Sequence, residues 1–230
     1  MRTLYYITIF FFIKNYQSQE LPNYNQISKN TFGLSITNSS FNGDLETLTK
    51  ENIFLSTRSI YGLNYERTIN HHFSLLSNIS WGKLSSNNSF GNFESSIFQT
   101  SIENVFYFNK IYNNENKLSP YLSLGLGLLR FNSYTDILDK NGFSYNYWDD
   151  GSIRDIPQSD SLTSAYLSRD YNYETKLEND SINYSNYSLF FPVSVGLLWK
   201  FKNLFNVKLF TTFNQLLTDW IDNISDGQND

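Results

Sequence analysis

The sequence contains no cysteine and only two histidines, which are the adjacent residues His71 and His72. The absence of cysteine excludes disulfides and thiolate zinc sites. Two neighbours in an extended chain point in opposite directions, so this pair cannot easily share a metal ion. A third histidine and a glycine-rich phosphate loop are also missing, which removes the parts of a nucleophilic triad or a nucleotide site. We therefore predict no enzyme, and no catalytic, cofactor-binding or metal-binding residues.

After the first twenty residues the chain also lacks any apolar run long enough to cross a bilayer as a helix. If the protein lies in a membrane, it must do so as a closed barrel, which satisfies backbone hydrogen bonds between strands. A basic excess is absent too, since 17 Lys and Arg stand against 22 Asp and Glu. Nucleic acid is therefore not an expected partner.

The first nineteen residues have the layout of a secretory signal peptide. Arg2 supplies a positive charge, residues 4–13 form a mostly apolar run, and a polar segment follows at residues 14–19. We predict a signal peptide over residues 1–19 and one domain over residues 20–230, although Gln17 and Gln19 replace the small residues expected at a cleavage site. A buried strand and an amphipathic anchor are the alternatives. Without Arg2 and Lys14, 15 basic residues face 22 acidic ones.

Aromatic residues make up 18% of the chain, with 17 Tyr and 20 Phe. Tyr, Phe, Asn and Ser together suit strands with one apolar and one polar face. The clearest example is 120–131, where Leu occupies every second position from 122 to 128, and Ser123, Gly125 and Gly127 lie between. Alternation of this kind predicts seven strands, at residues 31–38, 58–67, 73–82, 97–108, 120–131, 190–201 and 205–214.

These strands are longer than those of most soluble sheets and have the length that a tilted strand needs to cross a bilayer. Their connections alternate between long (39–57, 83–96, 132–189) and short (68–72, 109–117, 202–204). That rhythm is typical of outer-membrane barrels, with short periplasmic turns and long external loops. We predict an all-β, antiparallel up-and-down transmembrane barrel of about eight strands. A soluble sandwich or a lipocalin-like periplasmic binding protein, with the apolar face inside, is the alternative.

Charged residues also fall on the polar face. By parity, Glu66, Glu103, Lys200 and Lys208 point into the lumen, where charges must pair or reach water. A structural plug is the preferred interpretation, and a small-solute pore is the alternative. We expect replacement of Glu103 by Leu to lower thermal stability by leaving a lysine unpaired.

The connection 132–189 combines aromatic, acidic and amide side chains, including the stretches 145–148 and 170–173. Such mixtures suit recognition surfaces, so a surface ligand or protein is a candidate partner there. The loop also contains Asp149, Asp150, Asp155 and Asp160, but their spacing does not match the hand-type calcium loop. Solvated carboxylates are the preferred interpretation of these four residues.

Several stretches together resemble a known family, the OmpA-like outer-membrane barrels of unknown function that are abundant in Bacteroidota. They are residues 32–34 with 42–45, 80–84, 119–122 with 125–127, and 191–193. The most specific is similar to a family signature near the end of the chain, at Thr218, Asp219, Trp220, Asp222, Asn223 and Ser225.

The resemblance implies a location in the cell outer membrane, outer-membrane lipid and the barrel-assembly machinery as partners, and a structural or surface-interaction role without cofactor or catalysis. Members of the family continue past the signature into a further strand, whereas this sequence stops at residue 230. An even number of strands is expected. A truncated reading frame, a short closing strand near residues 53–55 and a partner chain are the alternatives for the eighth.

Overall fold

The computed structural model describes residues 3–13, 30–42, 57–87, 92–109, 117–158, 164–177, 185–201, 205–218 and 221. Within these ranges the fold is all-β, and no helix is long and apolar enough to cross a membrane. The long strands are β1 (Thr3–Ile13), β2 (Asn30–Asn42), β3 (Arg58–Thr68), β4 (Phe73–Asn87), β5 (Asn92–Tyr107), β6 (Leu118–Thr135), β10 (Tyr187–Phe201) and β11 (Phe205–Leu216). The short strands are β7 (Asn146–Tyr147), β8 (Ile153–Arg154) and β9 (Thr175–Lys176).

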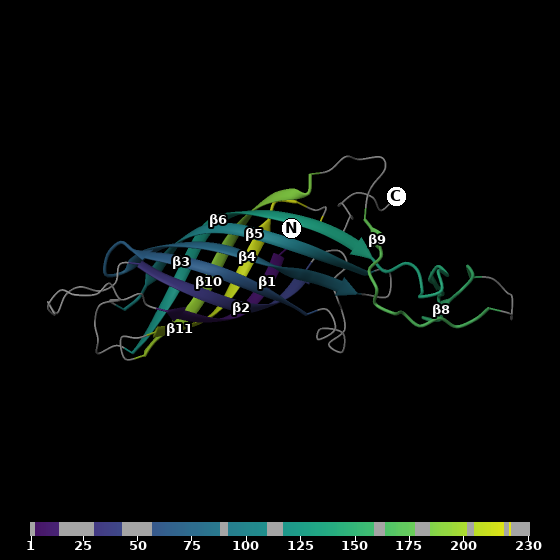
Figure 1. The fold of residues 1–230 in the computed structure, drawn as a ribbon, viewed down its shortest axis with the longest axis horizontal. Helices are drawn as coiled ribbons and strands as arrows, with labels where there is room; N and C mark the ends of the chain where they lie inside the picture. The colour runs from purple at the N-terminus through teal and green to yellow at the C-terminus, as the bar shows by residue number, and fades with distance from the viewer. Residues whose placement is uncertain are drawn as a thin grey trace.

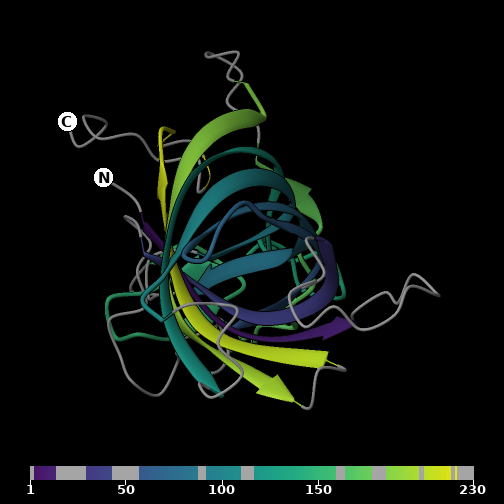
Figure 2. The same ribbon diagram turned by 90° about the vertical axis from the view of Figure 1, so that its left-hand side faces the viewer.

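The long strands form an antiparallel ring in which each strand pairs with its neighbours in sequence. The order is β10, β11, β1, β2, β3, β4, β5 and β6, and pairing of β6 with β10 closes the ring. Figure 2 views this ring from one end, and Figure 1 shows its strands tilted against the long axis of the molecule. The prediction of an antiparallel up-and-down barrel is confirmed.

The seven predicted segments coincide with long strands, except that Phe108 lies just beyond β5, and these strands extend further than alternation indicated. β4 runs to Asn87 and β5 begins at Asn92, so most of the predicted loop 83–96 is paired sheet. The pairing of Ser85 with Glu94 and of Leu84 with Ser95 carries no apolar alternation. Backbone hydrogen bonds hold this extension of the hairpin together, and the pattern of its side chains does not predict it.

The eighth strand comes from the segment that the sequence predicts as a leader. β1 lies between β11 and β2, in a register that places Thr3 opposite Gln215 and Asn42. Its sequence is apolar at nearly every position, so it lacks the period of two that marks the other strands. Residues 53–55, the alternative closing strand, lie outside the described residues. Cleavage after residue 19 stays a prediction.

The apolar face of the sheet points outward. On β6, Leu124, Leu126 and Leu128 are each at least half exposed, while Ser123 between the same strand's leucines is buried. Around the ring, the apolar side chains that are likewise exposed include Leu34, Ile36, Leu63, Ile79, Phe98, Ile102, Val195, Leu197, Leu209 and Phe213. A lipocalin-like protein would have the opposite arrangement, with its apolar side chains inside.

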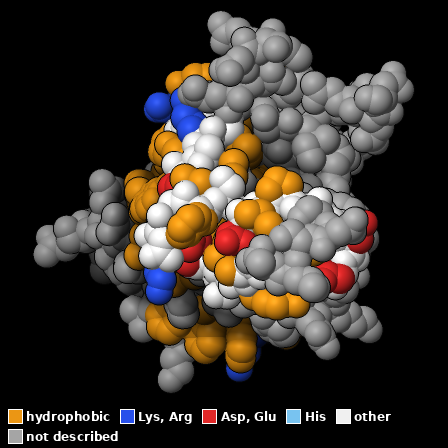
Figure 3. All heavy atoms as spheres, turned by 90° about the vertical axis from the view of Figure 1, so that its right-hand side faces the viewer, with side chains coloured by type: hydrophobic (Ala, Val, Ile, Leu, Met, Phe, Trp, Pro, Cys, Tyr) orange, Lys and Arg blue, Asp and Glu red, His pale blue; other side chains and the backbone are white. Residues whose placement is uncertain are grey.

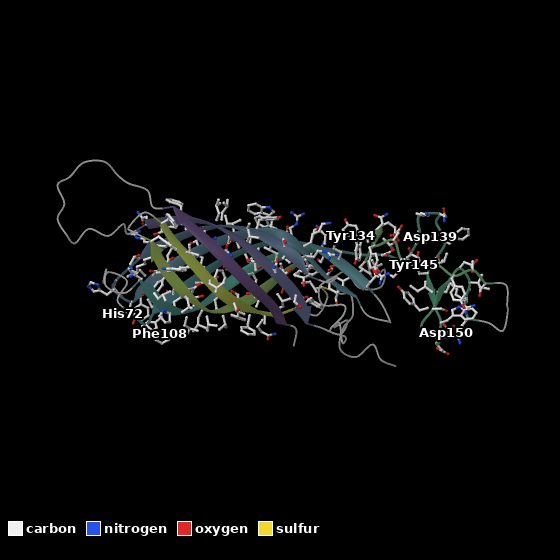
Figure 4. All side chains as sticks on the ribbon, turned by 90° about the horizontal axis from the view of Figure 1, so that it is seen from below. His72, Phe108, Tyr134, Asp139, Tyr145 and Asp150 are labelled. Carbon is white, nitrogen blue, oxygen red and sulfur yellow. The ribbon has the colours of Figure 1, made fainter. Side chains whose placement is uncertain are left out.

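The interior is closed by two apolar clusters with polar residues between them. At the end with the long connections lie Phe41, Ile60, Leu84, Phe93, Ile97, Leu129, Phe131, Phe190, Leu216 and Ile221. Toward the end with short turns lie Leu76, Val105, Tyr107, Tyr121 and Leu198, with Phe210 packed against them. Figure 4 marks the two ends, with His72 and Phe108 at the short turns and Asp139 and Asp150 at the other.

Candidate functional site

The lumen contains a buried ion pair between strands that are not neighbours in the ring. Lys208 Nζ on β11 lies 2.6 Å from Glu66 Oε2 on β3. The Tyr107 hydroxyl donates a hydrogen bond of 2.6 Å to the other carboxylate oxygen. The ammonium also lies over the rings of Tyr107 and Tyr121, 5.4 and 4.9 Å from their centroids. Both charges are therefore satisfied, as burial in a low-dielectric interior requires.

Glu103 is buried in the same lumen but has different partners. Its carboxylate accepts hydrogen bonds from Ser101 Oγ (3.0 Å) and Ser123 Oγ (2.7 Å). We expected that replacement of Glu103 would destabilise the barrel by leaving a lysine unpaired. That reason is wrong, because Lys208 forms its ion pair with Glu66. Parity identified which side chains face inward, but it could not assign partners across the ring.

Lys200, the fourth predicted lumen charge, lies near the end of β10. It is half-buried, and its backbone N–H donates to the Lys117 carbonyl at 2.9 Å. The buried position before it on the same face is occupied by Leu198, which belongs to the apolar cluster at the short-turn end. The structure thus places Glu66, Glu103 and Lys208 deep inside the barrel and Lys200 at its rim.

An internal cavity of about 60 Å³ lies between the two apolar clusters. Serine, threonine and asparagine side chains line much of it, and among the described residues its charged lining residues are Glu103 and Lys208. Its lining includes Phe190 from the cluster at the long connections, and Tyr121 and Phe210 from the cluster toward the short turns. A cavity of this size holds on the order of four waters, so it is a pocket inside a filled barrel.

Two residues of the terminal signature region are described. Thr218 follows β11, and Ile221 is completely buried in the apolar cluster at the long-connection end. Ser133 Oγ donates a 2.5 Å hydrogen bond to the Ile221 carbonyl. The signature residues Asp219, Trp220, Asp222, Asn223 and Ser225 lie outside the described residues. Ile221 was missed from the sequence, where it appeared only as a spacer in the signature.

Beyond β6, the described residues of the long connection are held to the barrel by Asp136. The carboxylate of this fully buried residue pairs with Arg169 Nε at 3.4 Å and accepts the Tyr171 N–H at 3.1 Å. Asn92 of β5 bonds both the N–H and the carbonyl of Asp136. Burial raises the pKa of Asp136 above its ordinary value, and the nearby Arg169 only partly offsets this.

Tyr171 adopts a left-handed backbone conformation, with φ of 58°. This conformation is uncommon for a residue other than glycine and marks segments whose surroundings hold them in place. Here the N–H of Tyr171 is bound by Asp136, and the Asp170 N–H donates to the Tyr145 hydroxyl at 3.1 Å. The ring of Tyr171 remains 50% exposed, with Arg169 against it at 5.2 Å.

Glu174 fastens the start of the connection. Its Oε1 accepts hydrogen bonds of 3.0 Å from the backbone N–H groups of both Ile137 and Leu138. Burial acts to raise the pKa of Glu174, but these backbone donors outweigh it and hold the pKa below its ordinary value. β9, which follows Glu174 directly, pairs with the end of β6.

Farther out, Arg154 organises the outermost described part of the connection, where β7 pairs with β8 (Figure 1). Its guanidinium lies 4.0 Å from the Trp148 ring centroid and 4.4 Å from that of Tyr166. It also donates to Ser164 Oγ at 2.6 Å and pairs with Asp150 at 3.2 Å. An arginine between two aromatic rings gains both cation–π and packing energy.

Exposed aromatic and acidic side chains share this end of the molecule. Tyr166 is 73% exposed, and Phe143 and Tyr147 are also exposed. Figure 3 faces this end and shows acidic side chains beside hydrophobic ones. Within the stretch 145–148, Tyr145 is buried while Tyr147 is exposed, and recognition by this stretch stays a prediction.

The predicted absence of a metal site was based on the histidines and the loop carboxylates. His72 Nδ1 lies 2.8 Å from the Tyr107 carbonyl oxygen, in the turn between β3 and β4. Asp149 and Asp155 are engaged by Gln158 and the Ala165 N–H, whereas Asp160 lies outside the described residues. Within the described ranges, no three His, Asp or Glu side chains converge as metal ligands.

Comparison with known proteins gave no match to a protein-family model, a curated protein or a solved structure.

Proposed function

We propose that this protein is a non-enzymatic barrel of a bacterial outer membrane, with a structural or surface-interaction role. The observation that carries the proposal is the outward apolar face of a closed antiparallel ring. Leu, Ile, Val and Phe side chains around the ring would each lose favourable burial energy in water, whereas lipid tails would cover them. A barrel with an apolar exterior and a polar interior is the arrangement that a bilayer requires.

Aromatic residues at the short-turn end support this proposal. Phe106 packs against Phe73 and Phe108, with ring centroids 5.1 and 5.3 Å apart. At the end of β10, before the turn to β11, Trp199 lies 4.7 Å from Phe201, measured between ring centroids. Aromatic girdles of this kind lie at the interface between lipid and water.

The filled interior favours a structural role over conduction. Apolar clusters lie on both sides of the polar cavity, and the Glu66–Lys208 pair bridges the lumen. A small-solute pore would require a continuous water-filled path. Function then depends on the parts outside the barrel, chiefly the described residues of the connection between β6 and β10.

That connection supports a surface-interaction role because its exposed aromatics are held in defined positions. Arg154, Trp148 and Tyr166 form one stack, and Tyr171 is held by the Asp136 contacts. Tyr, Trp and Arg are the residues that contribute most at binding interfaces. We propose this part of the chain as the site where a surface ligand or protein is bound.

Cell fractionation with heat-shift electrophoresis tests the proposal. The full chain, expressed with its own first nineteen residues, should appear in the outer-membrane fraction and migrate differently before and after boiling. Protease added to intact cells should cut within residues 136–177 and leave the barrel. A product in the soluble extract would overturn the outer-membrane assignment. Conductance in planar bilayers that changes when Lys200 or Glu103 is neutralised would favour a pore instead.

A further inference from the structure

The outer face of the barrel changes from apolar to basic toward the long connections, on the neighbouring strands β4, β5 and β6 (Figure 1). On β6 the exposed leucines end at Leu128, and the next outward position is the exposed Arg130. On β4 the exposed Trp81 is followed on the same face by Lys83, whose side chain is 57% exposed. Basic side chains therefore begin where the apolar belt ends.

The strand register places these side chains in two adjacent rows. Trp81, Phe98 and Arg130 are directly opposite one another across β4, β5 and β6. Tyr187 of β10 continues this row on the other side of Arg130, and Lys83 begins the next row outward. Because neighbouring strands lie about 4.8 Å apart, the backbones of Lys83 and Arg130 are separated by roughly 10 Å across the sheet. Two long basic side chains can approach one anionic group across that separation.

Arg130 carries a charge that no carboxylate in the described part of the chain balances. Its guanidinium lies 5.8 Å from the centroid of the Tyr187 ring and forms no ion pair with the described residues. Lys83 shares its partner, Glu94, with Arg58. The Glu94 carboxylate lies 2.6 Å from Lys83 Nζ and 2.9 Å from Arg58 Nε. Arg130 and Lys83 therefore bring excess positive charge to the edge of the apolar belt.

An apolar belt that ends in basic groups fits an amphiphile with an anionic head. Acyl chains would cover the exposed leucines of β6, and the head would meet the guanidinium of Arg130. A guanidinium binds two phosphate oxygens at once, which gives the contact a defined geometry. The row that begins at Lys83 continues through Ser96 to Asn132, which adds a hydroxyl and an amide as hydrogen-bond donors.

We propose that Arg130 and Lys83 bind the phosphate-bearing headgroup of an anionic membrane lipid, whose acyl chains lie along the leucines of β6. The site rests on the proposed membrane barrel, because the acyl chains are held by the same apolar belt that contacts the bilayer. A phosphate monoester suits the site best, since its charge of about −1.5 to −2 matches two basic groups.

Quenching of Trp81 fluorescence by lipids with brominated acyl chains tests the site, because Trp81 lies in the same row as Arg130. The full chain with Trp148, Trp199 and Trp220 replaced by Phe is refolded into phosphatidylcholine vesicles that contain brominated phosphatidic acid or brominated phosphatidylcholine. One basic group near the headgroups favours an anionic lipid by about fivefold, so we expect phosphatidic acid to associate at least that much more strongly. Equal association of the two lipids would overturn the proposal.

Three variants of this protein locate the effect. Arg130→Gln should remove most of the preference for phosphatidic acid, and Lys83→Gln should weaken it. Arg67→Gln is the matched control and should keep the preference, since Arg67 is exposed on β3 at the short-turn end, with Asn30 and Leu75 opposite. A full preference in Arg130→Gln would overturn the assignment. Loss of the preference in inorganic phosphate, compared with chloride at equal ionic strength, would show a site for free phosphate and also contradict it.

Heat-shift electrophoresis separates failure of this site from failure of the membrane barrel. A heat-shifted band in pure phosphatidylcholine vesicles reports the barrel whatever the headgroup, so equal lipid association in such a barrel contradicts the headgroup site alone. If the wild type gives no band in any vesicle, the membrane barrel is contradicted, and the site with it. If only the single-tryptophan protein lacks the band, native mass spectrometry of the wild type and Arg130→Gln in detergent decides. Wild-type protein should then retain phosphatidic acid in preference to phosphatidylcholine, and equal retention would overturn the proposal.

Discussion

Lys208 on β11 and Glu66 on β3 are 142 residues apart in the sequence, and their side chains meet at 2.6 Å in the lumen. In the ring, β1 and β2 separate the two strands. The pair therefore spans the interior and fixes the distance between opposite walls, which backbone pairing between neighbouring strands does not do. Tyr107 on β5 adds a third strand to the contact through its hydroxyl.

Replacement of Glu66 by Leu should destabilise the barrel by about 3–5 kcal/mol, because it leaves Lys208 buried without a counter-charge. Urea-induced unfolding in detergent, followed by tryptophan fluorescence, measures the loss. The double variant Glu66→Leu with Lys208→Met should recover much of it, since both charges are then absent. Equal destabilisation in the single and double variants would show that lost packing, not the unpaired ammonium, is responsible.

The narrow interior predicts different costs for two glycines. A Cβ at Gly82 would lie 2.6 Å from the Ser59 carbonyl oxygen and 2.8 Å from Ile60 Cα, and neither backbone atom can rotate away. At Gly62 the closest atom is Ser35 Oγ, a side-chain end that can move. We expect Gly82→Ala to lower the free energy of unfolding by about 1–3 kcal/mol and Gly62→Ala to cost less. The same urea titration ranks them, and a reversed order would contradict the close packing at Gly82.

The hydrogen bonds of Glu174 predict a pH dependence of the connection beyond β6. Its pKa is lower in the folded protein than in the unfolded chain, so the ionised carboxylate favours the docked connection. That contribution is present above the ordinary glutamate pKa of 4.5 and is lost as the pH falls through the lowered folded value. Hydrogen exchange at the Ile137 and Leu138 amides should accelerate in Glu174→Gln at neutral pH. Protection in the variant equal to that of the wild type would rule out this anchoring.

The fold could be predicted from alternation along the chain because each long strand except β1 has one apolar face and one polar face. In β6 the leucines and the small polar residues separate without exception from Leu122 to Leu128. The inward direction of Glu66, Glu103 and Lys208 followed from the same parity. Their partners did not, because the contacts of Lys208 depend on the diameter and register of the whole ring. The Arg154 stack was also missed, since Trp148, Arg154 and Tyr166 meet only after the connection folds back on itself.

Alternation does not identify β1 as a strand, because an apolar run without alternation is compatible with a leader as well as with a strand. In the ring, removal of β1 would expose the edges of β2 and β11, which is costly in lipid. We expect a chain that starts at Glu20 to lose the heat-shifted band on refolding, while the full chain keeps it. N-terminal sequencing of the protein from membranes shows whether residues 1–19 are present. A stable barrel from residue 20 onward would mean that β1 is dispensable and that residues 1–19 act only as a leader.

Arg154 provides a test that separates the surface connection from the barrel. Arg154→Lys keeps the charge but loses the planar group that lies between Trp148 and Tyr166 and reaches Ser164 and Asp150. The lost cation–π contacts cost about 0.5–1 kcal/mol each at exposed sites, enough to loosen a segment built on few strand pairs. We expect faster proteolysis between residues 144 and 167 and an unchanged heat-shifted barrel. Lys140→Ala, in the exposed turn after Asp139, is the matched control and should leave both properties unchanged. If Arg154→Lys resists protease as well as the wild type does, the stack does not hold the connection, and the Asp136 and Glu174 contacts would be sufficient to order it.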